Sequence, residues 1–349
     1  MKIENNYIKE VRNIKASVII AAYNIERYIE RCINSVKNQT LKEIQIVVVN
    51  DGSTDSTKEK IEKLALEDNR IELYSQSNKG LIEARKNGLK MAKGEYVLFI
   101  DGDDWIEINT LELLYNKAKE NDSDIVLYNA YWAYDNKKLD MKTYKKECLA
   151  NIKENPVKSL FLEEIIPSIW SKFINRNFLL QNKVEYPSNI CFGEDLSSVL
   201  SMFINNPKIN VLEKNLYNYY QRNDNLTQKG NRRVVELIDV INFIERKLNE
   251  KDLNIQYKKE FEHLAFKQLL VSGMQYVGIQ NKDLHRMMYD KYKTIGIDIK
   301  YNKYIQESIK KLSLKDKFRI NLYEYNYNLG FNYDKVVNVA GNIYHKIKN

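Results

Sequence analysis

The first half of the chain alternates between short apolar runs and amphipathic stretches. The runs are rich in β-branched residues and bounded by polar ones, which is typical of strands buried on both faces of a parallel sheet. The strands predicted in this way are residues 17–22, 44–49, 71–74 and 96–100. Between them, apolar positions at helical spacing predict helices over residues 26–38, 55–66 and 80–92. Strands that alternate with helices favour an α/β domain with right-handed crossovers.

The second half of the chain is mixed at first and then helical. The elements expected here are helices over residues 111–119 and 193–204 and strands over residues 124–131 and 211–220. Beyond Gly230, apolar residues spaced by three and four predict helices, starting with Leu237, Ile241, Ile244 and Leu248. We therefore expect two domains. Residues 1–229 form the α/β domain, and residues 230–349 form a smaller, mainly α-helical region.

Basic residues are concentrated at the end of the chain. The formal net charge is +8, and residues 281–349 alone hold 14 Lys and Arg against 7 Asp and Glu. This distribution argues against a nucleic-acid-binding protein, which spreads its basic residues along the contact face. It favours a local basic surface suited to anionic lipid headgroups or an acidic partner. A solvated, lysine-rich helical surface is the alternative.

The last residues of the chain form an amphipathic pattern. Its apolar positions are Val336, Ala340, Ile343 and Ile347, and lysines 335, 346 and 348 flank them. Such a helix suits peripheral contact with a membrane. A helix packed on its own domain fits the pattern too, and the helical region as a whole could instead hold an acceptor or form a homo-oligomer.

The sequence predicts a cytoplasmic protein, either free or held at the inner face of the cell membrane. No apolar run approaches the ~20 residues of a transmembrane helix. The segment from Met1 to Lys15 is charged throughout and lacks the apolar core of a signal peptide. The three cysteines are widely spaced and odd in number, which indicates reduced thiols.

Carboxylates gather where the fourth predicted strand ends. Asp101, Asp103 and Asp104 follow the apolar run directly, and Gly102 lets the backbone turn between them. At the carboxyl edge of an α/β sheet, where ligands bind, such a cluster suits a hard cation such as Mg²⁺ or Mn²⁺ together with a diphosphate. An Asp-rich turn that caps the helix starting near Asn109 is the plain alternative.

Two other predicted strands end in residues that suit a nucleotide. The first strand is followed by Tyr23, whose ring could stack on a base, and the second by Asp51, which could accept a hydrogen bond from a base or a ribose. Neither the glycine-rich turn of dinucleotide-binding domains nor a Walker-type loop is present. The phosphates would therefore be held by a metal and basic side chains.

These motifs, in this order, resemble those of family 2 glycosyltransferases of the GT-A fold, over roughly residues 15–230. Residues 17–24 (Ser-Val-Ile-Ile-Ala-Ala-Tyr-Asn) and 48–55 (Val-Val-Asn-Asp-Gly-Ser-Thr-Asp) resemble the signatures of the first two strands. Residues 78–88 are similar to the ribose and uracil loop, and residues 101–103 to the Asp-x-Asp motif. Residues 192–195 (Phe-Gly-Glu-Asp) are similar to the catalytic Glu-Asp pair.

The resemblance implies a role for each matching position. Asp195 would be the general base, Asp103 would bind Mn²⁺ or Mg²⁺, and Asp101 would contact the ribose or the hydrated metal. The residues expected to bind the donor nucleotide are Ala22, Tyr23, Asp51, Lys79, Arg85, Asp101 and Arg222. We expect Glu194 and Trp170 on the acceptor side.

Plainer readings stay open for several of these residues. Asp51 could form an Asx turn, and Arg85 could be a surface charge on a helix. Glu194 and Asp195 could be first-turn acids favoured by the helix dipole.

The sequence departs from the family pattern in two places: the first touches no reactive group, and the second favours single-sugar transfer over polymer synthesis. Ala21 stands where a proline is common, and the Gln-x-x-Arg-Trp motif of processive members is absent. Arg222 is near that position and could contact the diphosphate. All three histidines lie beyond residue 260, so a carboxylate is the natural base in the α/β domain. A lone base suits an inverting, single-step transfer.

The sequence thus predicts an inverting, metal-dependent glycosyltransferase. It would move one hexose or N-acetylhexosamine from a UDP-sugar to a saccharide acceptor, free or lipid-linked, in surface polysaccharide or glycoconjugate synthesis. A catalytically idle module that binds a glycan or a partner is the first alternative. A sugar nucleotidyltransferase is the second, although residues 21–25 lack the glycine-rich, basic loop that such enzymes use.

Overall fold

The computed structural model describes residues 13–222 and 232–348, and their side chains as far as Val339. Two compact units divide the chain. The sheet unit consists of the residues up to Tyr144, Ser168–Val184 and Pro207–Gln221. The helical unit consists of Lys145–Pro167, Glu185–Asn206 and the residues from Arg222 onward. The boundary that we predict between residues 229 and 230 lies outside the described residues, and two earlier segments join the helical unit.

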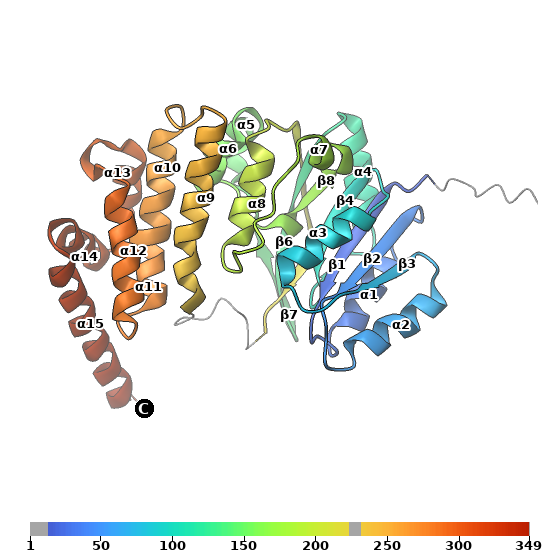
Figure 1. Ribbon diagram of the computed structural model, residues 1–349, viewed down its shortest axis with the longest axis horizontal. Helices are drawn as coiled ribbons and strands as arrows, with labels where there is room; N and C mark the ends of the chain where they lie inside the picture. Colours follow the sequence, from blue (N-terminus) through green and yellow to red (C-terminus); the bar gives the residue numbers. More distant parts are fainter. Residues whose placement is uncertain (1–12, 223–231, 349) are drawn as a thin grey trace, which may run out of the picture. The chain divides into compact units, whose positions relative to one another are not determined.

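Four parallel strands form the first half of the sheet. They are β1 (Ala16–Ala22), β2 (Ile44–Asn50), β3 (Ile71–Ser75) and β4 (Tyr96–Asp101), in the spatial order β3-β2-β1-β4 (Figure 1). Nearly every side chain of β1, β2 and β4 is buried, as expected for strands covered on both faces. All four strands confirm the predicted ones to within a residue or two.

The second half of the sheet is mixed. It contains β5 (Trp105–Ile106), β6 (Ile125–Tyr134), β7 (Lys137–Met141), β8 (Lys172–Asn175) and β9 (Ile209–Tyr220). The order continues from β4 through β8, β6 and β9 to β5, and β7 pairs with β6. β8 runs antiparallel to both β4 and β6, whereas β6 and β9 are parallel. The short strands β5 and β7 have no apolar run and escape prediction.

Helices cover both faces of the parallel strands. The helices of the sheet unit are α1 (Ile29–Lys37), α2 (Thr57–Glu67), α3 (Leu81–Met91), α4 (Thr110–Glu120) and α7 (Arg176–Gln181). The chain steps outward from β1 to β3 and then back to β4, so right-handed crossovers put α3 on the face opposite α1 and α2. Gly88 lets α3 approach β1 closely, since a β-carbon there would lie 2.3 Å from the Ile19 side chain.

The helical unit contains ten α-helices in the described residues. They are α5 (Leu149–Glu154), α6 (Pro156–Phe161), α8 (Glu194–Phe203), α9 (Leu237–Glu250), α10 (Lys258–Ala265), α11 (Met274–Val277), α12 (Lys282–Thr294), α13 (Lys303–Lys310), α14 (Leu314–Tyr325) and α15 (Tyr327–Lys348). Phe266–Gly273, between α10 and α11, forms a π-helix. The four apolar positions that predict α9 are all buried. An α/β sheet flanked by helices, with a helical C-terminal region, confirms the predicted fold class.

None of the helices in residues 13–222 and 232–348 combines the length and the apolar character needed to cross a bilayer. The end of the predicted amphipathic pattern, from Ala340 on, belongs to α15, but its side chains lie outside the described residues.

A buried histidine joins the last helices of the helical unit. His285 of α12 is fully buried, and its ring lies 5.1 Å from the ring of Phe331 in α15. Its Nε2 is 3.4 Å from the Tyr323 hydroxyl of α14. Burial, with a smaller effect of Arg319, lowers the pKa of His285 to about 4, although Asp334 acts in the opposite direction. The imidazole is therefore neutral in the folded protein at neutral pH.

This histidine makes the helical unit sensitive to acid. The unfolded chain takes up the proton near pH 6.5 and the folded one only near pH 4, so stability falls as the pH is lowered through this window. Between pH 7 and pH 5 we expect the protonation of His285 to lower the free energy of unfolding by about 2 kcal/mol. Chemical denaturation of wild type and His285→Phe at both pH values measures it. Equal losses in the two proteins would contradict the assignment.

Candidate active site

The carboxyl ends of β1, β2 and β4 meet at one edge of the sheet. Ala21 of β1 is in register with Asp101 of β4, and Ala22 is in register with Asn50 of β2. The backbone N–H of Asp51 donates to the carbonyl of Ala22 over 2.8 Å. Tyr23 follows β1 and is 47% exposed. The predicted donor-side residues of the first two strands are thus brought together.

Asp51 holds the loop that precedes α3. Its carboxylate accepts hydrogen bonds from the backbone N–H groups of Lys79 and Gly80, each over 2.8 Å, and from the side chain of Gln76 over 2.7 Å. Asp51 itself is 3% exposed. Because three donors within the protein occupy this carboxylate, Asp51 fixes the loop that precedes α3. Direct contact with a base stays a prediction.

Arg85 forms an ion pair at the acidic end of β4. Its Nη2 lies 2.8 Å from Oδ1 of Asp101. The guanidinium is almost fully buried, whereas the Asp101 side chain is 27% exposed. Arg85 is therefore not the solvated surface charge of the alternative reading, because its charge faces the carboxylate cluster and partly neutralises it.

The turn after β4 lies close against the end of β1. A β-carbon on Gly102 would lie 2.9 Å from the carbonyl oxygen of Ala21 and 2.2 Å from the Ile25 side chain, so only glycine fits without a shift. The next residue, Asp103, is half-buried, and its carbonyl accepts a hydrogen bond from Nη2 of Arg31 over 2.8 Å. The turn is thus fixed from both sides.

Arg31 lies between aromatic rings. Its guanidinium carbon is 3.8 Å from the ring centre of Trp105 and 4.4 Å from that of Tyr220, both distances typical of cation–π contacts. One residue of α1 therefore connects the turn after β4, the start of β5 and the end of β9. Nothing in the sequence pattern singles out Arg31, because its partners lie about 70 and 190 residues away.

Asp104 points into the sheet unit. It is 1% exposed, and its carboxylate accepts from the Tyr217 hydroxyl over 2.6 Å and from the backbone N–H of Tyr220 over 2.8 Å. Burial raises the pKa of Asp104 well above its ordinary value, and the negative charges of Asp103 and Asp101 raise it further. Of the three clustered aspartates, this one holds β9 and does not face a ligand. Sequence reasoning misses this role.

The acidic turn does not provide a complete metal site from protein side chains. In the part of the chain that the structure describes, no group of three or more His, Cys, Asp or Glu side chains could hold a metal ion by itself. Asp101 and Asp103 are both partly exposed, and oxygen ligands of this kind match Mg²⁺ or Mn²⁺. Mg²⁺ in nucleotide sites commonly takes one or two carboxylates and completes its shell with phosphates and water.

The predicted base belongs to the helical unit. Gly193 adopts a left-handed backbone angle (φ +81°) and is followed by Glu194 and Asp195 in the first turn of α8. The carboxylate of Glu236 accepts from the backbone N–H groups of Cys191 and Phe192 over 2.6 and 2.9 Å. This fixes the segment that leads into α8. Arg222 follows β9 and is half-buried.

Trp170 packs inside the sheet unit. Its ring stacks on Tyr217 at 4.5 Å and on Tyr219 at 5.5 Å, and it is 4% exposed. Its backbone carbonyl accepts a hydrogen bond from the Tyr128 hydroxyl. The expectation that Trp170 contacts an acceptor is corrected by this burial, because the ring supports β9.

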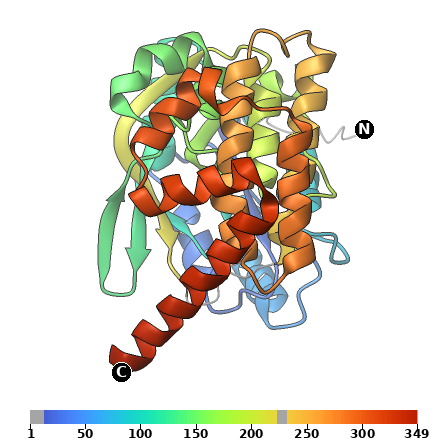
Figure 2. The ribbon, with the colours of Figure 1, turned by 90° about the vertical axis from the view of Figure 1, so that its left-hand side faces the viewer.

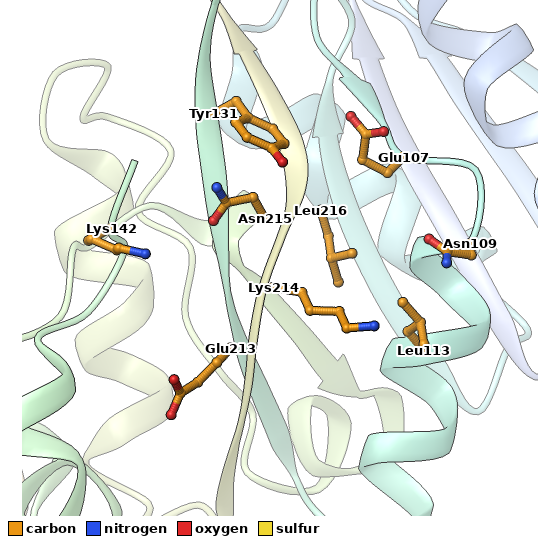
Figure 3. Close-up of a pocket in the computed structure, with 9 residues that line it drawn as sticks. All are labelled: Glu107, Asn109, Leu113, Tyr131, Lys142, Glu213, Lys214, Asn215 and Leu216. Carbon is orange, nitrogen blue, oxygen red and sulfur yellow. The ribbon is translucent and has the colours of Figure 1, made fainter. Parts of the chain in front are cut away.

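A cavity of about 450 Å³ opens elsewhere in the sheet unit (Figure 3). Glu213, Asn215 and Leu216 of β9 contribute to it, beside an irregularity where β9 shifts register against β6. Tyr131 of β6 and Leu113 of α4 also line it. None of the predicted site residues does, so we do not place the chemistry there.

Comparison with known proteins places these motifs in a family. Residues 17–192 match the family model described as Glycosyl transferase family 2. A cholesterol galactosyltransferase of Borreliella burgdorferi is 33% identical over 61% of this chain and 62% of its own length. EpsH of Bacillus subtilis, provisionally named as a glycosyltransferase, is 28% identical over 84% of this chain and 86% of its own.

A solved structure shares the fold. S. aureus TarS 1–349 in complex with UDP aligns with a TM-score of 0.55 at 23% identity, over 80% of this chain and 90% of that one. A structure of the same protein with UDP-GlcNAc aligns with a TM-score of 0.53. At this identity the likeness concerns the fold alone.

Tyr217 should be important for the stability of the acidic turn. Its hydroxyl donates to Asp104 and accepts from the backbone N–H of Asp101. Tyr217→Phe would remove this hydrogen-bond partner from the Asp104 carboxylate and from the N–H of Asp101. We therefore expect urea denaturation to show a free energy of unfolding about 2 kcal/mol lower. Tyr134→Phe, at a tyrosine that is 39% exposed, is the control and should change stability little. A loss below about 0.5 kcal/mol for Tyr217→Phe would contradict this role.

Proposed function

Because this chain belongs to glycosyl transferase family 2, we propose that it transfers a single hexose or N-acetylhexosamine from a UDP-sugar to a hydroxyl group of a saccharide. The observation that carries the proposal is the convergence of Tyr23, Asp51 and the Asp101–Asp103 turn at one sheet edge. This is the edge at which α/β sheets bind their ligands.

The donor side has groups for each part of a nucleotide diphosphate. Tyr23 offers an exposed ring for the base, and Asp51 holds the Lys79–Gly80 loop beside it. Arg85 brings a positive charge to Asp101, and Arg222 is our candidate for the diphosphate. The TarS structures with UDP and UDP-GlcNAc support uridine as the nucleoside of the donor.

We assign the cation site to Asp103, with Asp101 beside it. When bound, Mn²⁺ or Mg²⁺ would act as a Lewis acid on the diphosphate oxygens. The close packing of Gly102 and the hydrogen bond from Arg31 to the carbonyl of Asp103 fix the backbone of this turn before a ligand arrives. Such preorganisation is what stabilises charge that develops during a reaction.

Asp195 is our candidate for the general base. The acceptor oxygen would form a bond to the anomeric carbon as the bond from that carbon to the diphosphate breaks. The hydroxyl proton goes to Asp195, and UDP leaves with the electron pair. Because attack comes from the face opposite the diphosphate, the configuration inverts, and no covalent intermediate with the enzyme is needed. Glu194, its neighbour, is our candidate on the acceptor side.

The acceptor would be a saccharide in surface polysaccharide or glycoconjugate synthesis. One relative is named a cholesterol galactosyltransferase, and another, from Bacillus spizizenii and 31% identical over 59% of this chain, is named a poly(ribitol-phosphate) beta-glucosyltransferase. A lipid-linked saccharide therefore fits as well as a free one, and we expect the reaction on the cytoplasmic side of the cell membrane.

The alternative, a catalytically idle module that binds a glycan or a partner, would not use Asp195 as a base. Asp195→Asn keeps the shape of the side chain but removes the acceptor for the hydroxyl proton. We expect UDP affinity within a factor of about two of wild type and transfer reduced at least about 100-fold. Asp239→Asn is the control, since Asp239 is an exposed acid in the first turn of α9. Near-normal turnover in Asp195→Asn would remove this residue from the mechanism.

The cation site predicts metal-dependent nucleotide binding. Titration calorimetry of UDP should show affinity at least about tenfold higher with Mn²⁺ than without it. Asp103→Ala should abolish this gain, and Glu59→Gln, at an exposed residue of α2, should leave it intact. Equal gains in wild type and Asp103→Ala would place the metal elsewhere. A thermal-shift screen of nucleotide-sugars would then identify the sugar.

A further inference from the structure

An exposed apolar face runs along α14 in the helical unit. Leu314, Phe318 and Tyr325 are 84%, 53% and 84% exposed. Their spacing of four and seven residues places them on one side of the helix. Ile320 and Tyr323, which lie on the other side, are buried. The helix thus packs by one face and presents a second apolar face to solvent.

The apolar face continues onto α15. Leu329, Val336 and Val339 are 45%, 67% and 56% exposed. The ring of Tyr333 contacts the Phe318 ring edge-on at 5.3 Å, which joins the two helices at this surface. Figure 2 shows α14 leading into α15. We call the exposed residues Leu314, Phe318, Tyr325, Leu329, Val336 and Val339 the α14–α15 face.

Lysines surround this face, and the acids near it are engaged within the unit. Lys310, Lys311, Lys315 and Lys335 are exposed. The three acids between residues 310 and 339 all have partners. Asp334 pairs with Arg319 over 2.8 Å, Asp316 accepts from the Ser313 hydroxyl over 2.7 Å, and Glu324 accepts from the Tyr292 hydroxyl over 2.8 Å. Residues 310–339 hold six Lys and Arg against these three acids, so the segment that carries the face has a net positive charge.

We propose that the α14–α15 face binds the surface of a membrane that contains anionic lipids. Apolar side chains on one face of a helix enter the boundary between headgroups and acyl chains, and lysines at the rim are attracted to the negative surface. A second copy of the chain is a poorer occupant, because it would bring two lysine-rich rims together. This inference does not rest on the proposed reaction.

Flotation of the full chain with lipid vesicles tests the proposal. We expect binding to vesicles of phosphatidylcholine with phosphatidylglycerol, weak binding to pure phosphatidylcholine, and release at high salt. The double variant Leu314→Ser/Phe318→Ser should bind about tenfold more weakly, since it removes inserted apolar surface. The double variant Lys311→Glu/Lys315→Glu should bind anionic vesicles at least about tenfold more weakly. Each lysine near such a surface raises the affinity about fivefold.

Leu66→Ser is the matched control, because Leu66 is 90% exposed on α2 of the sheet unit. It should bind like wild type. Circular dichroism should show all variants folded, since every altered side chain is exposed. The proposal fails if wild type does not bind anionic vesicles, or if the α14 variants bind like wild type. It also fails if the wild type does not bind vesicles and sedimentation shows that it is a dimer, which the substitutions Leu314→Ser/Phe318→Ser dissociate. UDP binding, measured separately, reports on the proposed reaction alone.

Discussion

The end of β4 depends on the neutralisation of its own negative charge. Three aspartates lie within four residues, from Asp101 at the end of the strand to Asp104, and such a cluster would repel itself in a partly buried site. Arg85 pairs with Asp101, and the carboxylate of Asp104 is buried against the Tyr217 hydroxyl. These contacts let the turn exist without a bound cation, so it is formed before the donor and the metal that we propose would bind.

The parallel strands and their helices could be predicted because their signals are local. An apolar run of five or six residues is enough to place β1, β2 and β4, and the alternation with helices gives the crossovers. β8 is antiparallel and only four residues long, and β5 has two residues, so neither carries a pattern of its own. Their pairing is decided by distant segments.

The candidate site, too, could be predicted only where its signals are local in the sequence. The motif residues Asp51, Asp101 and Asp103 follow strands that the sequence locates, so their convergence could be expected. The contacts that hold them could not. Tyr217 reaches Asp104 across 113 positions of the chain, and Trp170 stacks on Tyr217 from another segment. A lone tryptophan in a sequence says little about whether it faces a ligand or a core.

The family motifs also bear on how substitutions should be interpreted. Asp51 accepts two backbone hydrogen bonds from the Lys79–Gly80 loop, so its loss would disturb that loop whether or not the carboxylate touches a nucleotide. The same holds for Arg85 and Asp104, because each holds another residue of the fold in place. Loss of transfer in a variant of these residues therefore cannot by itself assign a contact with substrate. Asp195, the base that we propose, belongs to the other compact unit, so its substitution changes none of the residues that make these contacts and tests its proposed role more directly.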